Sequence, residues 1–299
     1  MYMGFFDISP FVDKNSERLM LSKRIGAIEK ELRSKFLITD QMDGGAFEIS
    51  DGQAPADHLN DGEWHDFAPS QSLWGGKEAY CRFRQVITVP DRMKGKDIFY
   101  TVSAAEDGAW SHTTNPQFIL YVNGVLLSGM DENHAEIRIL KEAKGGEKLK
   151  IHLCAYSDDY TYRGRMFLSS RIFTRDEQVL RLSYHLRTIR DTANLFGADD
   201  APRVEMISKL TEALRNLDLS LPYGPDFLAT VKATNRAIEE TILGSNPANA
   251  VVSAIGHTHI DVAWLWRLRQ TREKAVRSFA SMNYLMHEYA DFRFISSQA

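Results

Sequence analysis

The chain has 299 residues, of which 43% are hydrophobic and 25% charged, with a formal net charge of -4. These values are typical of a soluble globular protein of about two domains, and they leave no basic surface for nucleic acid or an anionic membrane. The sequence contains no apolar run of about 18 residues that could span a bilayer. Its start, MYMGFFDISPFVDK, lacks the pattern of a secretory signal, so we expect a cytoplasmic protein.

An amphipathic helix is predicted over residues 15–36. Leu21, Ile25, Ile28 and Leu32 recur at steps of four, three and four, which places them on one stripe of a helix. We expect this stripe to pack against the body of the protein. A dimer contact, and therefore a homo-oligomer formed through the N-terminal region, is the alternative.

A β-sandwich is predicted over residues 37–174. Apolar and polar residues alternate along several short runs, and Asn123-Gly124 lies between two apolar runs in a pattern typical of a β-hairpin. Gly145-Gly146 marks a further turn. Such spacing predicts an antiparallel sandwich, and it resembles the jelly-roll, galactose-binding-like modules found at the front of many glycosidases. We expect a structural or oligomerisation role for it.

Cysteines and isolated tryptophans add two expectations about this sandwich. Cys81 and Cys154 lie in apolar, strand-like runs, so we expect buried free thiols rather than a disulfide framework. Trp64 and Trp74 stand among polar residues. They could stack on sugars or plug the end of the sandwich core, and the sequence leaves both open.

Helical spacing returns over residues 175–246. Three helices are predicted, and Pro202 and Pro225 lie near the starts of the second and third, where a missing N–H group costs nothing. We expect His185 to be a surface or packing histidine of the first helix. Gly244 to Pro247 then breaks the pattern, so this region is predicted to be a connector that docks the sandwich onto the next domain.

Val251 to Gln270, VVSAIGHTHIDVAWLWRLRQ, carries the candidate chemistry. The apolar run VVSAI predicts a buried strand, which Gly256 ends by letting the backbone turn. His257, His259 and Asp261 follow at alternate positions, where the side chains of an extended segment point the same way. Imidazole nitrogen and carboxylate oxygen are ordinary zinc ligands. This spacing therefore predicts a divalent metal site, whose remaining ligands come from elsewhere.

A helix and a second strand follow this motif. The strand is predicted at Phe292 to Ser296, and it completes a βαβ unit whose strands pair in parallel. The apolar residues of the predicted helix fall roughly on one stripe: Leu268, Ala275, Phe279, Met282, Leu285 and Met286. In parallel sheets, sites form at the carboxyl ends of strands, where HTHID lies.

The run GHTHIDVAWLWRLRQTREKAVRSF resembles the opening catalytic motif of the family 38 glycoside hydrolases, the class II α-mannosidases, and most closely their bacterial and cytosolic branch. The resemblance implies a retaining exo-α-mannosidase that acts on mannose-containing oligosaccharides with one metal ion, zinc foremost and cobalt or manganese as alternatives. By position, His259 and Asp261 are the metal ligands, and Trp264 lines the pocket for the mannose. His257 matches no ligand of the family.

The same resemblance implies that this chain has no catalytic carboxylates of its own. In the family, the nucleophile, the acid/base and the last histidine ligand lie well downstream of the first motif, so we expect them beyond Ala299. We therefore expect this chain by itself to bind metal poorly and to hydrolyse nothing.

Two other functions remain open at this point. A metal-dependent amidohydrolase or phosphoesterase would use His257 and His259 as ligands, with Asp261 secondary. A non-catalytic carbohydrate-binding or assembly module would instead use residues 40–175, and a plain scaffold is favoured over binding there.

The predicted architecture is multidomain. An N-terminal helical segment spans residues 1–36, the antiparallel β-sandwich 37–174 and the helical connector 175–246. Residues 247–299 are predicted to be the start of an α/β, parallel-strand catalytic domain, which is truncated here.

Overall fold

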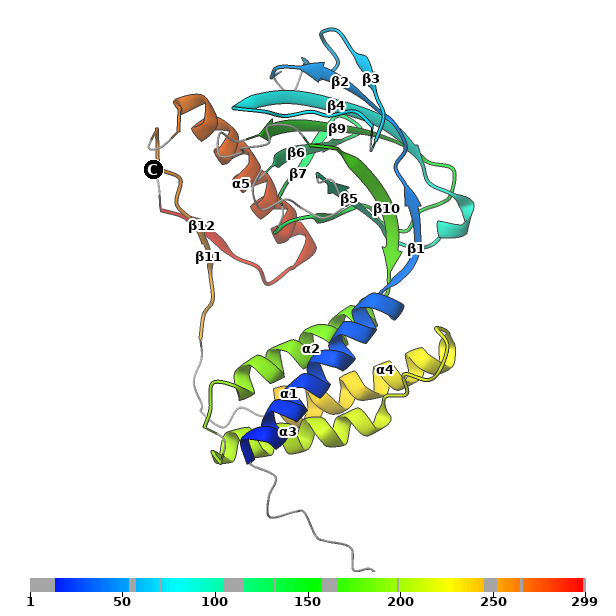
Figure 1. Cartoon of the computed structure of the whole chain (residues 1–299), viewed down its shortest axis with the longest axis vertical. Helices are drawn as coiled ribbons and strands as arrows, with labels where there is room; N and C mark the ends of the chain where they lie inside the picture. Colours follow the sequence, from blue (N-terminus) through cyan, green and yellow to red (C-terminus); the bar gives the residue numbers. More distant parts are fainter. Residues whose placement is uncertain are drawn as a thin grey trace, which may run out of the picture. The chain divides into compact units, whose positions relative to one another are not determined.

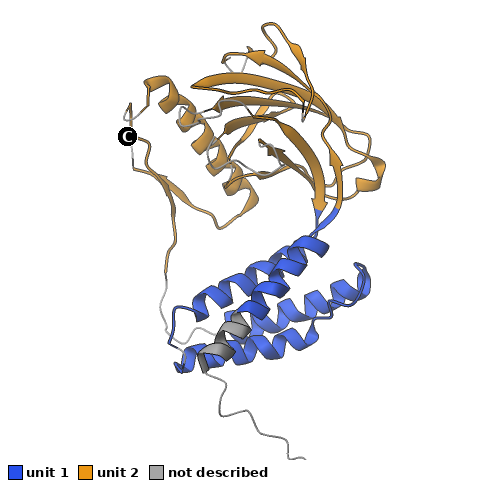
Figure 2. Cartoon of the chain, viewed as in Figure 1, with its two compact units in different colours: residues 1–39, 175–251 blue, residues 40–174, 252–299 orange. Residues whose placement is uncertain are grey.

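The computed structural model describes nine stretches of the chain: residues 14–53, 58–69, 71–104, 116–131, 133–157, 166–197, 199–244, 252–263 and 266–297. Side chains are described from residue 23 onward. The chain divides into two compact units (Figure 2), one made of residues 1–39 and 175–251 and the other of residues 40–174 and 252–299. Each unit has its own buried apolar cluster.

Helices that pack around an apolar core form the first unit. Its helices are α1 (Lys14–Glu31), continued by a π-helical turn (Leu32–Phe36), α2 (Glu177–Ala193), α3 (Ala201–Ala213), followed by a 3-10 turn (Leu214–Asn216), and α4 (Pro225–Ile238), continued by a second π-helical turn (Glu239–Leu243). The predicted helices are therefore confirmed. Asp176 caps α2, because its Oδ1 accepts hydrogen bonds from the N–H groups of Gln178 and Val179 at 2.9 and 3.0 Å. His185 packs on α4 with its Nδ1 3.1 Å from Asn235 Oδ1, as predicted for a packing histidine.

An antiparallel β-sandwich dominates the second unit (Figure 1). One sheet has the strand order β3-β2-β4-β9-β6-β7 and the other β1-β10-β5-β8. The strands are β1 (Ile38–Asp43), β2 (Phe47–Asp51), β3 (His65–Phe67), β4 (Ala79–Thr88), β5 (Ile98–Ser103), β6 (Gln117–Val122), β7 (Val125–Met130), β8 (Glu136–Leu140), β9 (Lys148–Ser157) and β10 (Ser169–Arg175). A short 3-10 turn, Asp91–Met93, follows β4. The predicted sandwich is confirmed.

Turn residues explain two of its connections. Asn123 and Gly124 join β6 to β7 with φ angles of 52° and 82°, the left-handed values that a tight hairpin requires. Gly145 and Gly146 also have positive φ, and they lie before β9. Both predicted turns are present.

Strand register explains why Cys81 and Cys154 form no disulfide bond with each other. Cys81 lies opposite Ala155, and Cys154 lies opposite Arg82, so the two thiols are one position out of register on neighbouring strands. Neighbouring positions point to opposite faces of a sheet. Neither cysteine forms a disulfide, as predicted, and burial raises the pKa of Cys154 to about 11.

Trp64 and Trp74 each pack against another side chain of the protein. Trp74 is fully buried and packs edge-on against Phe83, with ring centroids 5.3 Å apart, so it plugs the sandwich core. The guanidinium of Arg84 lies 4.3 Å from the ring centroid of Trp64, a cation–π contact that occupies one face of the indole.

The C-terminal segment forms the predicted βαβ unit. It consists of β11 (Gly256–Thr258), α5 (Leu268–Glu288) and β12 (Phe294–Ser296), and the two strands pair in parallel. Figure 1 shows α5 lying beside β6 and β7, on the face of the six-stranded sheet opposite the sandwich core. That sheet is therefore covered on both sides, by the four-stranded sheet and in part by α5.

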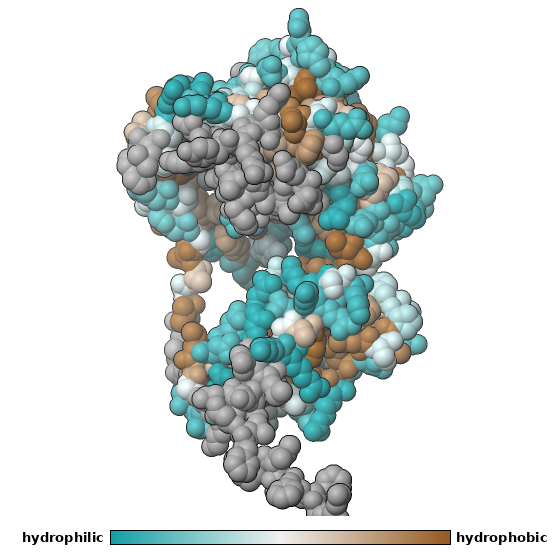
Figure 3. Space-filling model, in the orientation of Figure 1, coloured by the Kyte–Doolittle hydropathy of each residue, from teal (hydrophilic) through white to brown (hydrophobic). Residues whose placement is uncertain are grey.

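The expectation of a buried strand at VVSAI is wrong over the described residues 252–255. These residues form no strand, Val252 and Ile255 are 86% and 57% exposed, and the segment is largely brown in Figure 3. Gly256 opens β11 instead of turning the chain, and its N–H donates to the Arg293 carbonyl at 2.8 Å. The physical reason is that β11 pairs only with β12 among the described strands, so no further strand buries the apolar run.

The predicted apolar stripe of α5 is also not its buried face. Leu268, Phe279 and Met286 are exposed. The buried residues of the helix are small or polar: Gln270, Thr271, Ala280 and Ser281. The helix packs on the sheet through hydrogen bonds and close backbone contact, which hydrophobic periodicity does not detect.

The four predicted domain boundaries remain predictions. In the structure the N-terminal helix and the connector fall into one unit, while the start of the α/β segment belongs to the same unit as the sandwich. Among the described helices, none combines the length and hydropathy that a bilayer crossing requires.

Candidate functional site

His259 and Asp261 lie together in the loop that follows β11. His259 Nε2 is 2.9 Å from Asp261 Oδ1, and the two side chains are 57% and 42% exposed. Ile260, between them, is buried, which leaves its two polar neighbours on the open side. The expectation that alternate positions converge therefore holds for this pair. His257 is exposed on β11, and Trp264 lies outside the described residues.

Thr271 ties this loop to the first turn of α5. Its Oγ1 accepts hydrogen bonds from Ala263 N–H at 3.2 Å and Trp266 Nε1–H at 3.1 Å, and its hydroxyl faces the Asp261 carbonyl at 3.5 Å. Trp266 Nε1 also lies 3.2 Å from that carbonyl. Ala263 has a left-handed φ of 54°, which costs a non-glycine residue about 1–2 kcal/mol, so these contacts hold a strained turn.

Gln270, next to Thr271, ties the same turn to the sandwich. Its Oε1 accepts from Arg267 N–H at 2.6 Å, which satisfies one of the free N–H groups at the helix start. Its Nε2 donates to the Tyr156 hydroxyl on β9. Arg267 also forms an ion pair with Glu78, with Nη2 and Oε2 3.3 Å apart. The loop, the helix start and the sandwich are therefore connected by hydrogen bonds.

His259 and Asp261 would supply two of the four ligands of a tetrahedral zinc site. Two ligand atoms at zinc distances of about 2.0–2.1 Å lie roughly 3.3 Å apart in a tetrahedral site, close to the separation found here. Imidazole and carboxylate are also the ligand types that zinc accepts. Within the described part of the chain, no third histidine, cysteine, aspartate or glutamate joins them. The pair needs further ligands from outside the described residues.

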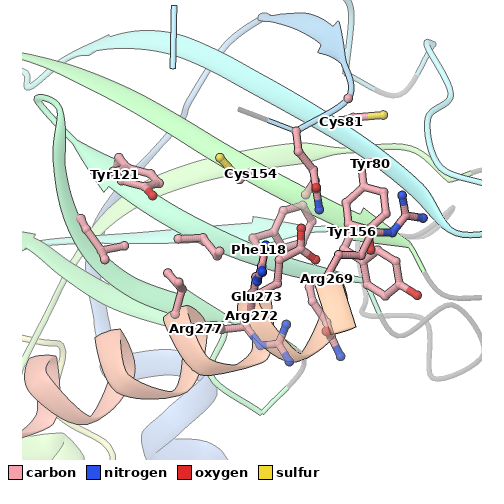
Figure 4. A pocket seen from close by; sticks show the side chains of 17 residues that line it. Tyr80, Cys81, Phe118, Tyr121, Cys154, Tyr156, Arg269, Arg272, Glu273 and Arg277 are labelled. Atoms are coloured by element: carbon pink, nitrogen blue, oxygen red, sulfur yellow. The ribbon is translucent and has the colours of Figure 1, made fainter. Parts of the chain in front are cut away.

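A cavity of about 610 Å³ lies between α5 and the outer face of the six-stranded sheet (Figure 4). The rings of Tyr80 and Tyr156 meet there with centroids 4.8 Å apart. The cavity is also lined by Glu273, and burial raises the pKa of its carboxyl to about 7, although Arg277 and Arg269 oppose that rise. Much of the remaining wall is apolar: Phe118, Ile119, Leu126, Cys154, Ala155 and Val276.

Sequence reasoning missed both Glu273 and this cavity. Glu273 falls off the predicted apolar stripe, so the stripe gives no sign that this residue is covered. Arg269, Glu273 and Arg277 stand at steps of four on α5 and so share one face. That spacing was the available signal, but only the packing of α5 on the sheet shows that the face is covered.

Comparison with known proteins finds one family model and several relatives that are similar to parts of the chain. Residues 249–299 match the glycosyl hydrolases family 38 N-terminal domain. Alpha-mannosidase G of Dictyostelium discoideum is 22% identical over 236 residues, which cover 73% of this chain and 20% of that protein. An alpha-mannosidase of Saccharomyces cerevisiae is 32% identical over 106 residues, covering 36% and 8%. Alpha-mannosidase 2C1 of Mus musculus is 46% identical over 48 residues, covering 16% and 5%.

The chain is therefore similar to the N-terminal part of family 38 α-mannosidases, as the motif around His259 predicted. The chain spans less than a quarter of the length of these curated relatives.

Solved structures add little to this assignment. A β-D-glucuronidase of Dictyoglomus thermophilum aligns at 15% identity with a TM-score of 0.30, covering 46% of this chain and 28% of that one. A β-glucuronidase of Ruminococcus gnavus in complex with D-glucuronic acid aligns at 9% identity with a TM-score of 0.30, covering 46% and 30%. Overlap this low supports no inference about function.

Proposed function

We propose that this chain is the N-terminal part of a metal-dependent, retaining exo-α-mannosidase that hydrolyses mannose-containing oligosaccharides in the cytoplasm. The observation that carries the proposal is the His259–Asp261 pair, which lies inside the segment that matches family 38. Both side chains are partly exposed, so a ligand can reach them.

His259 and Asp261 are the residues of this chain that would hold the ion, most simply zinc. When bound, such an ion supplies Lewis-acid stabilisation of developing charge next to the sugar. The protein's own part is to orient these donors, and Thr271 does so by fixing the backbone at Asp261. We propose Trp264 as a wall of the mannose site, since a flat indole packs well against a sugar ring.

Retention of configuration requires two carboxyl groups, a nucleophile and an acid/base, which flank the scissile bond. We assign neither role to a residue of this chain. The proposal therefore places both in the remainder of the enzyme, and it predicts that the chain by itself has no hydrolase activity.

The geometry favours neither of the two alternative functions. An amidohydrolase-type site would pair His257 with His259, whereas the described contact joins His259 to Asp261. A carbohydrate-binding module would use residues 40–175 alone, but the cavity beside Tyr156 is also lined by Arg269, Glu273 and Arg277 of α5, which lie outside that range. The proposal of an α-mannosidase is therefore preferred.

The test uses the enzyme that joins this chain to the rest of its family 38 domain. Asp261→Ala should abolish hydrolysis of an aryl α-mannoside. It should also lower zinc affinity by more than about 100-fold, the upper end of the loss seen when a residue that only supports a ligand is removed. His257→Ala is the matched control and should keep most of both. An active Asp261→Ala enzyme would contradict the proposal. Loss of metal on His257→Ala, with Asp261→Ala tolerated, would favour the amidohydrolase-type site.

A further inference from the structure

We propose that the β-sandwich positions the His259–Asp261 pair, and that the Tyr156 hydroxyl is the positioning group on the sandwich side. This inference rests on the proposed function, because it assigns the sandwich a task in building the metal-binding loop. It is carried by contacts that run from the sheet through α5 to the loop.

The first step is that α5 lies in direct contact with the backbone of β7. Gly129 N–H donates to Ser281 Oγ at 3.2 Å. A Cβ atom at position 129 would lie 2.1 Å from Arg277 Cγ and 2.9 Å from the Arg277 carbonyl oxygen. Only glycine permits this approach, so the distance between helix and sheet is set by the backbone.

The second step is that α5 is fixed near both ends. Towards its C-terminus, the Tyr284 hydroxyl accepts from Arg138 N–H at 2.9 Å, and Arg138 is paired with Glu288. At its N-terminus, Gln270 donates to the Tyr156 hydroxyl. A helix held at both ends and at its middle has no freedom to slide along the sheet, since one residue of sliding is a rise of about 1.5 Å.

The third step joins Gln270 to the loop. Gln270 and Thr271 are consecutive buried polar residues in the first turn of α5. Consecutive helical residues point about 100° apart, so Gln270 reaches the sandwich while Thr271 reaches the loop. Thr271 contacts the Asp261 carbonyl and the Ala263 N–H. Two consecutive helical residues therefore link Tyr156 to the backbone that carries the Asp261 carboxylate.

The loop needs this support because its two donors are exposed. Exposed side chains on an unsupported loop sample several arrangements, and each ligand that must be ordered on binding reduces metal affinity. The sandwich removes part of this cost by fixing the loop backbone in advance. This gives the predicted scaffold domain a specific task at the metal-binding loop.

The test is hydrogen–deuterium exchange of the 299-residue chain, read at residues 259–266, together with calorimetric titration of Zn²⁺ into the enzyme that joins this chain to the rest of its family 38 domain. Tyr156→Phe removes one hydroxyl, and Thr271→Val removes the hydroxyl that faces the loop. Each should speed exchange in the loop by about tenfold and weaken Zn²⁺ binding by about tenfold, in the range of supporting ligand partners. Thr271→Ser keeps a hydroxyl and should therefore keep the loop exchange rate and the Zn²⁺ affinity of the parent. The double variant should be no worse than the worse single variant, because both act on one path.

Tyr121→Phe is the matched control, since Tyr121 lines the same cavity from β6, and it should leave loop exchange unchanged. If Tyr156→Phe changes only the melting temperature and not loop exchange, the sandwich is a plain support and the inference is wrong. If loop exchange depends on Tyr156 but no variant or parent binds Zn²⁺ even in the extended enzyme, positioning stands and the proposed function fails.

Discussion

Glu273 is a carboxyl group that titrates near neutral pH inside the cavity beside α5. Its ordinary pKa is 4.5, and burial raises it to about 7. Arg277 and Arg269 lower it only in part, and Arg277 is itself buried enough for its own pKa to be lowered. Between about pH 4.5 and 7, the folded chain therefore holds a proton at Glu273 that the unfolded chain has released.

This proton makes the stability of the second unit depend on pH. A group whose pKa is raised on folding stabilises the fold less as the pH rises through the window from the unfolded to the folded pKa. The free energy of unfolding should therefore fall between about pH 4.5 and 7 through Glu273. Glu273→Gln, which stays neutral, should flatten this fall and be more stable than the parent at pH 8. Thermal unfolding at pH 5, 6, 7 and 8 measures this pH dependence. If the stability of both proteins changes with pH in parallel, the role of Glu273 is contradicted.

At the scale of elements, α5 shows how a helix can pack on a sheet through its polar face. Leu268, Phe279 and Met286 of its predicted apolar stripe are exposed. Thr271, Arg277 and Ser281 instead face the loop or the sheet. Phe279 still packs edge-on against Phe294 of β12, with ring centroids 6.1 Å apart. The contact with the sheet depends on Gly129, whose missing side chain leaves room for the helix.

Gly129→Ala should therefore be destabilising. The added methyl group would overlap Arg277, and overpacking of this kind typically costs about 1–3 kcal/mol. Gly26→Ala in α1 is the control: there a Cβ would meet only Arg190 Nη1 at 3.4 Å, and alanine favours a helix by about 0.5–1 kcal/mol. Urea denaturation compares the two, and equal stability of parent and Gly129→Ala would show that α5 does not pack as described.

At the scale of the whole molecule, the chain contains two apolar cores that belong to separate units. The sandwich core includes Phe83 and Phe118, and the helical core includes Leu182 and Phe227. A unit with its own core can unfold by itself. The helical unit also contains a buried carboxylate, Glu29, whose two oxygens accept from Arg187 and Arg190 at 2.8 Å each.

We expect two unfolding transitions, which spectroscopy can separate. All five tryptophans lie between residues 64 and 266 in the stretches of the second unit, so their fluorescence reports on the sandwich. Circular dichroism at a helix wavelength reports mainly on the first unit. Glu29→Ala leaves Arg187 and Arg190 without their shared acceptor, and should lower the helical transition by about 1–3 kcal/mol without moving the fluorescence transition. A single transition that shifts in both signals would contradict two independent cores.

The sequence by itself determined the local structure and the family. Asn123-Gly124 predicted a hairpin because few residues tolerate positive φ, and the 3.6-residue period predicted the helices of the first unit. The spacing of His259 and Asp261, with the residues that follow them, pointed to family 38 and was confirmed by comparison. These features depend on neighbours within a few residues, which is the range over which a sequence pattern carries information.

Only the tertiary structure decided which surfaces are covered. The burial of Glu273 and the polar packing face of α5 depend on strands that are more than a hundred residues away in the chain. Val252 and Ile255 are exposed because β11 pairs only with β12 among the described strands. The link from Tyr156 to Gln270 joins residues 114 positions apart, and no local pattern encodes it. Burial is set by long-range packing, so the sequence predicted the donors of the site but not the contacts that hold them in place.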